Sequence, residues 1–307
     1  MISEDRSGST HRPYRLALRG AQQMDLALRF AAGSDAAGLS VLALKGISIA
    51  DQLYAGIQNR PMADIDFLAV NSGRFRAMGD LARSLGLVEI GASDHALVFR
   101  EPSSRVVLEL HLALTACPGL FTVDAGALWE RRAVVPGTAM FRLSDPDLVV
   151  HLALHTAFQH AFTANEYHYG DFVRALEKLR PPLQEIVARA REWSALGPVG
   201  AMALVSARKN PDSSRVLELA ALTESFCPPG LARWIGSQPE MPPPFSVASL
   251  ARVRYHLAPS KWRYLARTLA PKSIPGRTLS RPGVIRRLAS LAAAAMRSPV
   301  PADRPLS

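Results

Sequence analysis

The stretch from Val41 to Val70 constrains the fold of this chain more than any other. Its first four residues are an apolar run typical of a buried strand, and Lys45-Gly46 interrupts that run. Apolar residues then recur at helical spacing as far as Tyr54, and a polar segment that ends in Arg60-Pro61 closes the predicted helix. Residues 64–70 form a second apolar strand. This strand–helix–strand unit predicts a sheet with helices packed on it.

Two acidic residues, Asp64 and Asp66, begin the second predicted strand. Side chains alternate across a strand, so these two carboxylates point the same way while Ile65 and Phe67 point into a core. Neighbouring carboxylates repel each other unless a cation lies between them, and hard divalent cations prefer oxygen ligands. The pair therefore predicts a metal site. The competing interpretation is an acidic strand end in solvent.

The order of these features resembles the signature of the uncharacterised nucleotidyltransferase family of bacterial proteins, within the DNA polymerase β-like superfamily. The matching elements are Leu44-Lys45-Gly46, Tyr54, Arg60-Pro61 and Asp64-Ile65-Asp66. The resemblance implies an α+β fold: a small mixed sheet with flanking helices, followed by a mostly helical region. It also implies transfer of a nucleoside monophosphate from an NTP to an unidentified acceptor, with release of pyrophosphate. Mg²⁺ is the expected metal, with Mn²⁺ as an alternative, ATP is the expected nucleotide, and the acceptor is a small molecule, a peptide or RNA.

The resemblance also assigns roles to individual residues. It implies that Glu109, from a later strand, completes the metal-binding and catalytic set with Asp64 and Asp66. It places the nucleotide phosphates at four residues: Lys45, Gly46, Ser48 and Arg60. His111 and Asp171 are candidates for the acceptor pocket.

Several of these residues have a competing structural interpretation. Glu109 fits a solvated strand edge, Lys45 fits a surface position, and Arg60 fits a loop salt bridge. Asp171 fits a helix cap equally well. The superfamily usually has Ser directly after the Gly, whereas Ile47 intervenes here, so the role of the Ser48 hydroxyl stays open.

The rest of the chain predicts further strands early and helices late. Helices are expected over 14–30 and 74–85, the second capped by Asn71 or Ser72. About five strands are expected, all before residue 115, the last three over 87–90, 96–100 and 106–114. Later helices are expected from Ser144-Asp145-Pro146-Asp147, and over 169–179, 183–195 and 200–207. Pro-rich linkers are expected at 228–230 and 239–244.

Composition divides the chain into four parts. We expect a disordered N-terminus (1–12), a nucleotidyltransferase-like core (13–142), a helical region (143–250) and a basic C-terminal segment (251–307). The last segment has 12 Lys or Arg and one acid, whereas the remainder has 24 basic and 25 acidic residues. A basic segment interleaved with aromatic residues predicts an anionic partner such as nucleic acid or lipid. The competing interpretation is a helix packed on its aromatic side, and the alternative function is a non-catalytic binding protein with a degenerate transferase fold.

The remaining signals bear on metals and location. His151 and His155 are four residues apart, a spacing found in zinc sites, but no HExxH motif is present and His160 is half a turn off their face in an α-helix. Core histidines are therefore the favoured interpretation, and we expect no zinc at this pair. Two distant cysteines, the absence of a signal-peptide pattern and the absence of a long apolar run predict a cytoplasmic protein without a transmembrane segment.

Overall fold

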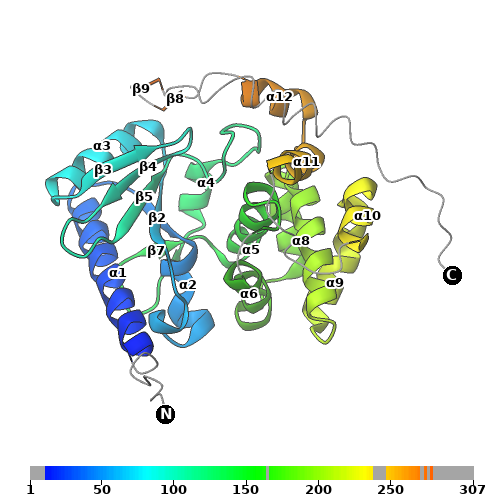
Figure 1. The fold of residues 1–307 in the computed structure, drawn as a ribbon, viewed down its shortest axis with the longest axis horizontal. Helices are drawn as coiled ribbons and strands as arrows, with labels where there is room; N and C mark the ends of the chain where they lie inside the picture. The colour runs from blue at the N-terminus through cyan, green and yellow to red at the C-terminus, as the bar shows by residue number, and fades with distance from the viewer. Residues whose placement is uncertain (1–10, 164–165, 238–246, 270–272, 275–276, 279–307) are drawn as a thin grey trace, which may run out of the picture. The chain divides into compact units, whose positions relative to one another are not determined.

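The computed structural model describes residues 11–163, 166–237, 247–269, 273–274 and 277–278 (Figure 1). The described chain divides into two compact units. The first comprises the residues up to Leu114, Asp124–Leu148 and Ile274–Arg277, and the second comprises Thr115–Val123, Val149–Ser273 and Thr278 onward. No helix in the described ranges is long and apolar enough to cross a membrane.

The first unit is built on a mixed sheet of seven strands in the order β3-β4-β5-β2-β1-β7-β6. The strand bounds are β1 Val41–Leu44, β2 Asp64–Ala69, β3 Val88–Ala92, β4 Ala96–Arg100, β5 Val107–His111, β6 Ala133–Val134 and β7 Phe141–Arg142. Strand β1 is antiparallel to β2 and parallel to β7, and β2 is parallel to β5. The expected α+β fold with a small mixed sheet is confirmed. The expectation that every strand precedes residue 115 is wrong, because β6 and β7 follow it.

A tight turn explains the two additional strands. The Thr138 amide donates to the Val135 carbonyl at 3.1 Å, and Gly137 has a φ of +73° after Pro136. Pro followed by a residue of positive φ is the signature of a type II turn. Each of these strands has only two residues, too few to show hydrophobic alternation in the sequence. The Pro136-Gly137 pair between them was nevertheless a visible turn signal.

Two helices cover one face of this sheet. They are α1 (His11–Ala36) and α3 (Ser72–Ser84), and Figure 1 shows both beside the strands. Their buried residues, including Phe30 and Met78, share a core with Phe67 and Leu108 of the sheet. Asn71 caps α3, because its side chain accepts the amide of Arg74, as expected. With that face filled by apolar side chains, the polar residues of β2 and β5 project from the other face.

The remaining secondary structure of the first unit is short. It comprises α2 (Lys45–Tyr54), the 3₁₀ turn η2 (Ile57–Asn59) and α4 (Ala125–Glu130). The Arg132 guanidinium lies over the rings of Trp129 and Phe141, 4.1 and 4.7 Å from their centroids. This stack ties the end of α4 to strand β7.

The second unit is helical, as expected. Its elements include α5 (Asp145–Ala153, which begins before it), the π-helical segments η3 (Leu154–Gln159) and η4 (Ala175–Leu179), α6 (Glu166–Arg174), α7 (Leu183–Glu192), α8 (Leu196–Lys209), α9 (Ser214–Thr223), η5 (Glu224–Phe226) and α10 (Pro229–Ser237). The expected linker at 228–230 is wrong, because helix α10 begins at Pro229. A proline fits the first turn of a helix, where its missing N–H has no intrahelical partner to lose. The expected linker at 239–244 lies outside the described residues.

Only part of the basic C-terminal segment is described. It contains α11 (Val247–Leu257), α12 (Lys261–Leu269), and the short paired strands β8 (Ser273–Ile274) and β9 (Arg277–Thr278). Tyr264 is buried in the second unit against Phe158, whereas Trp262 is 82% exposed. Arg254 donates hydrogen bonds to the carbonyls of Phe158 and Gln159, so its guanidinium stabilises the fold. Most of the expected segment, and residues 1–10, fall outside the described ranges.

Candidate active site

Strand pairing brings the predicted acidic residues together. In the parallel pair β2–β5, Asp66 lies opposite Glu109 and Asp64 lies opposite Val107. In the antiparallel pair β1–β2, Asp66 lies opposite Leu44, the residue before Lys45. Paired residues share a face of a sheet. Asp66 therefore lies between Glu109, on the neighbouring strand β5, and Lys45, which directly follows the other neighbouring strand, β1.

Close contacts connect four of these residues. Lys45 Nζ lies 2.8 Å from Asp66 Oδ1, and His111 Nε2 lies 2.8 Å from the same oxygen. His111 Nε2 is also 3.5 Å from Glu109 Oε2. One side-chain ligand atom from each of Asp66, Glu109 and His111 lies within 4.8 Å of the others. We call Asp64, Asp66, Glu109 and His111 the acidic cluster.

Burial makes the electrostatics of this cluster strong. Burial and then the charge of Asp66 raise the pKa of Asp64 to about 6. Burial also acts to raise the pKa of Asp66, but Lys45 and His111 outweigh it and hold that pKa well below its usual range. For Lys45 and His111, burial lowers the pKa but the adjacent carboxylates prevail and raise both. The ion pairs thus balance Asp66, while Asp64 remains costly to ionise.

The turn from β1 into α2 aims Lys45 at Asp66. Lys45 has a φ of +49°, a left-handed conformation that is uncommon for a residue with a side chain. The Ser48 hydroxyl donates to the Lys45 carbonyl at 2.8 Å, which ties down this turn. The structure therefore gives Ser48 a local role in shaping the turn.

Gly46 is packed closely against the loop that precedes β2. A Cβ atom at this position would lie 2.4 Å from Met62 Sδ and 2.7 Å from Arg60 Nη1. Arg60 is 7% exposed and donates to the carbonyl of Pro61. The lack of a side chain at Gly46 thus lets Arg60 lie against the start of α2, beside the Lys45 turn.

Asp171 is the one predicted site residue that the structure places in the second unit. It lies on α6 and is fully buried. The acidic cluster and the Lys45 turn belong to the first unit.

His95 belongs to the surroundings of the site and was missed from the sequence. Its ring centroid is 5.7 Å from that of His111, and its Nδ1 is 3.0 Å from Asp94 Oδ1. Burial lowers the pKa of His95 despite that contact with Asp94. The pairing of Ala96 with His111 explains this proximity. The register of the β4–β5 hairpin was the signal that could have revealed it.

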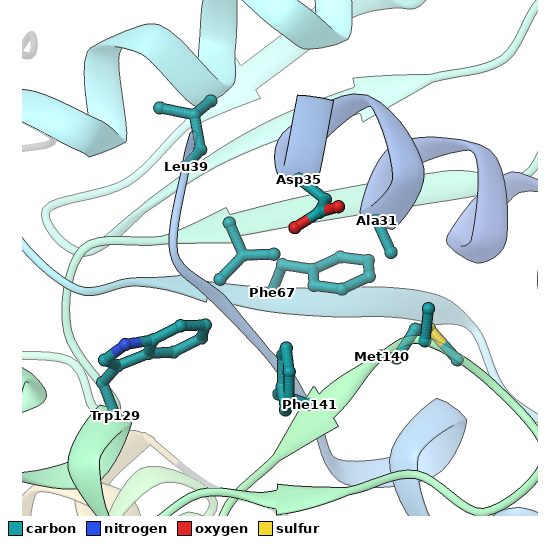
Figure 2. Close-up of a pocket in the computed structure, with 9 residues that line it drawn as sticks. Ala31, Asp35, Leu39, Phe67, Trp129, Met140 and Phe141 are labelled. Atoms are coloured by element: carbon teal, nitrogen blue, oxygen red, sulfur yellow. The ribbon is translucent and has the colours of Figure 1, made fainter. Parts of the chain in front are cut away.

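A small pocket on the opposite face of the sheet is separate from the acidic cluster. Figure 2 shows it between α1 and the sheet, with Phe67, Asp35 and Trp129 among its lining residues. Phe67 and Asp66 are neighbours in a strand, so they point to opposite faces. The pocket volume of about 30 Å³ holds about two water molecules, far less than a nucleotide needs.

The mixed sheet presents two acids on one strand and a third on the adjacent parallel strand, the arrangement that the family resemblance implied. The chain belongs to the family described as uncharacterised nucleotidyltransferase, whose model matches residues 12–208. The family resemblance inferred from the signature residues is confirmed, and the chain is an enzyme of this transferase class.

Two solved structures of an antibiotic-resistance protein are similar to part of this chain. The solution structure of the antibiotic-resistance factor ANT(2'')-Ia has 16% identity and a TM-score of 0.41, and the match covers 56% of this chain and 93% of that chain. The crystal structure of ANT(2'')-Ia in complex with adenylyl-2''-tobramycin has 17% identity and the same TM-score, and the match covers 56% of this chain and 97% of that chain. No curated protein matches the chain.

Proposed function

We propose that this enzyme transfers a nucleoside monophosphate from an NTP to an acceptor, with release of pyrophosphate, and that it requires a divalent metal. The observation that carries this proposal is the register that sets Asp66 opposite Glu109, with Asp64 two residues earlier in the same strand. Those three carboxylates supply the hard oxygen ligands that Mg²⁺ prefers.

The residues of the cluster fit a divalent cation. Burial, and then the charge of Asp66 that Lys45 and His111 do not balance fully, raise the pKa of Asp64, and a bound cation would favour its ionised form. Asp64, Asp66 and Glu109 would hold Mg²⁺, or Mn²⁺ as an alternative. When bound, such a metal acts as a Lewis acid on phosphate oxygens and lowers the pKa of an attacking hydroxyl.

The cationic residues beside the cluster would bind the triphosphate. Lys45 and a metal compete for Asp66, so a nucleotide phosphate is the natural alternative partner for the Lys45 ammonium. Arg60 and Gly46, packed together at the start of α2, lie beside the same turn, and Ser48 holds its shape. We assign all four residues to the nucleotide side of the site.

We keep His111, in the first unit, and Asp171, in the second, as two separate candidates for contact with the acceptor. The contacts of His111 with Asp66 and Glu109 support a further role, which is to hold both carboxylates in position. The acceptor is a small molecule, a peptide or RNA, ATP is the expected nucleotide, and the cytoplasm is the compartment in which we expect the reaction. The exposed arginines of α12 are our candidates for an anionic partner.

The proposal is tested with purified protein, Mg²⁺, each labelled NTP and a cell extract as the source of acceptors. We expect transfer of label from the α-phosphate position, lost on chelation of the metal. Asp66→Asn should reduce turnover by at least about a hundredfold, the scale of removing one group from a preorganised electrostatic site. Asp51→Asn, an exposed neighbour on α2, is the matched control. Full activity in a folded Asp66→Asn protein would remove the site assignment, and no transfer with any NTP would favour the non-catalytic alternative.

A further inference from the structure

Three histidines converge in the second unit, whereas the acidic cluster belongs to the first. His155 lies in the π-helical segment η3, His160 ends that segment and His168 lies on α6. We call these three residues the histidine cluster. His155 is buried, whereas the other two are partly exposed, so solvent reaches one side.

The ring nitrogens of the histidine cluster lie close enough together to share a metal ion. Nε2 of His155 and Nε2 of His160 are 3.2 Å apart, and one nitrogen from each of the three rings lies within 4.8 Å of the others. In a tetrahedral zinc site with Zn–N bonds near 2.05 Å, two ligand nitrogens are about 3.3 Å apart. The ring centroids are separated by 4.5, 5.0 and 5.4 Å. The His155 and His168 rings are stacked with their planes 15° apart, so one of these two rings must rotate before both can present a nitrogen to a single ion.

The π-helical turn explains why His160 joins this cluster. The His160 amide donates to the His155 carbonyl at 3.1 Å, an i to i+5 hydrogen bond. A π-turn aligns residues five apart, whereas an α-helix would place them half a turn apart. The expectation that His160 faces away is therefore wrong, and His151 lies outside the group that shares a metal-binding distance.

Local packing holds the loop that brings His168 to the other two. Ala161 and Phe162 both have positive φ angles, which reverse the chain directly after His160. The Tyr169 hydroxyl donates to the carbonyl of the fully buried Phe162 at 2.5 Å. The residue after His168 is thus fastened to the loop after His160.

We propose that His155, His160 and His168 form a binding site for a first-row transition-metal dication, with Zn²⁺ as its principal occupant. Imidazole nitrogens suit Zn²⁺, Cu²⁺ and Ni²⁺, whereas Mg²⁺ prefers oxygen, so this site is chemically distinct from the acidic cluster. Three protein ligands leave one tetrahedral position for water. The ion joins η3 to α6 across the intervening loop and stabilises the second unit.

Two alternatives to a zinc ion at the histidine cluster are a hydrogen bond without any metal and a zinc ion at the acidic cluster, and each predicts a different outcome of the zinc titration. Two neutral imidazoles at 3.2 Å can share one proton in a hydrogen bond, with no metal involved. The acidic cluster also includes a histidine and two carboxylates at metal-binding distance, so zinc bound there must be distinguished. The sequence-based expectation of no zinc at His151 and His155 is revised here for His155 alone.

The test uses the full-length chain, stripped with a chelator and titrated with Zn²⁺ against a chromophoric competitor. We expect one high-affinity zinc per chain by elemental analysis, and a rise in Tm of several degrees on binding, since a ligand of the folded state stabilises it. Co²⁺ should give the visible absorption bands of a four-coordinate site. His168→Gln and His160→Gln should each weaken Zn²⁺ binding by about tenfold to a hundredfold or more, because loss of even an outer-shell partner of a metal ligand has an effect of that size.

Two matched variants locate the ion. His151→Gln alters a histidine one turn earlier in the chain, and Asp66→Asn removes a ligand of the acidic cluster; both should retain the zinc, the cobalt bands and the rise in Tm. The proposal is overturned if the native chain binds no zinc in the low micromolar range, or if folded His168→Gln binds it as the native chain does. Loss of the zinc in Asp66→Asn, with retention in His168→Gln, overturns it too and assigns the ion to the acidic cluster.

Discussion

Asp64 links the ionisation of the candidate active site to the stability of the protein. Burial and the charge of Asp66 raise its pKa to about 6, whereas a carboxyl in an unfolded chain titrates near 4. Between these values the folded state holds the proton more tightly. The contribution of Asp64 to stability therefore falls as the pH rises from about 4 to about 6, in the absence of metal.

Replacing this residue should reveal that loss directly. In metal-free protein, Asp64→Asn should raise the free energy of unfolding at pH 7 by about 1–3 kcal/mol, and the gain should disappear near pH 4. Urea denaturation at pH 4, 5.5 and 7 with a chelator measures it, and Asp51→Asn is the exposed control. Addition of Mg²⁺ should stabilise the native protein more than the variant. A variant less stable than the native protein at pH 7 would contradict this account of Asp64.

Gly46 offers a test of the role of Arg60. A methyl group at position 46 would displace the ends of the Met62 and Arg60 side chains, which are flexible, while Ala favours the helix by about 1 kcal/mol. The two effects oppose each other, so Gly46→Ala should change the free energy of unfolding by less than about 1 kcal/mol. Its KM for NTP should nevertheless rise about tenfold or more, the scale of a lost hydrogen bond to a charged group.

Arg60→Gln is the companion variant for this measurement. It should raise the KM for NTP by a similar factor, because both changes withdraw the same guanidinium from the phosphates. An unchanged KM in both variants, together with reduced stability in Arg60→Gln, would assign Arg60 to the loop alone.

At the level of elements, helix α12 has two aromatic residues in contrasting environments. Tyr264 is 3% exposed and meets Phe158 edge-on, whereas Trp262 is 82% exposed. Tyr264→Ala should therefore lower the free energy of unfolding by about 3 kcal/mol, in the range of large aromatic truncations. Trp262→Ala should change it by less than about 0.5 kcal/mol. Chemical denaturation of both variants measures the difference, and equal losses would show that Trp262 also packs against the protein.

In the described part of the basic segment, some basic side chains stabilise the fold and others are exposed to solvent. Arg254 on α11 and Lys261 on α12 donate to backbone carbonyls, whereas Arg263 and Arg267 are exposed. The competing interpretation of the segment, a helix packed on its aromatic side, thus holds for Tyr264. It leaves the exposed arginines as the candidates for an anionic partner.

For the whole molecule, the uneven charge distribution predicts where anionic partners bind. Reversal of Arg263 and Arg267 to Glu should reduce retention on heparin and flatten its salt dependence, because each phosphate-like contact releases counterions. The control reverses Arg15 and Arg76, which are also exposed and change the net charge equally. Equal loss in the two double variants would show that net charge alone governs retention, and a loss of fold in the first would make the segment structural.

Much of the fold followed from patterns within short stretches of the sequence. Alternation along 64–70 placed Asp64 and Asp66 on one face, and the caps at Asn71 and Ser144 marked helix starts that the structure confirms. These features depend on neighbours a few residues away, and so periodicity and capping chemistry reveal them. The signature around Lys45-Gly46 was local in the same sense, and it was sufficient to identify the family.

Contacts between distant segments required the folded chain. The pairing of Asp66 with Glu109 joins residues 43 positions apart, and strand register of this kind arises from the packing of a whole sheet. The ion pair of Lys45 with Asp66 depends on a left-handed turn for which a lysine gives no signal. The histidine cluster depends on a π-turn, whose single additional residue rotates every later side chain relative to an α-helix. Local sequence thus determined which residue types face a site, whereas the partners of each residue were set by backbone geometry that only the assembled chain possesses.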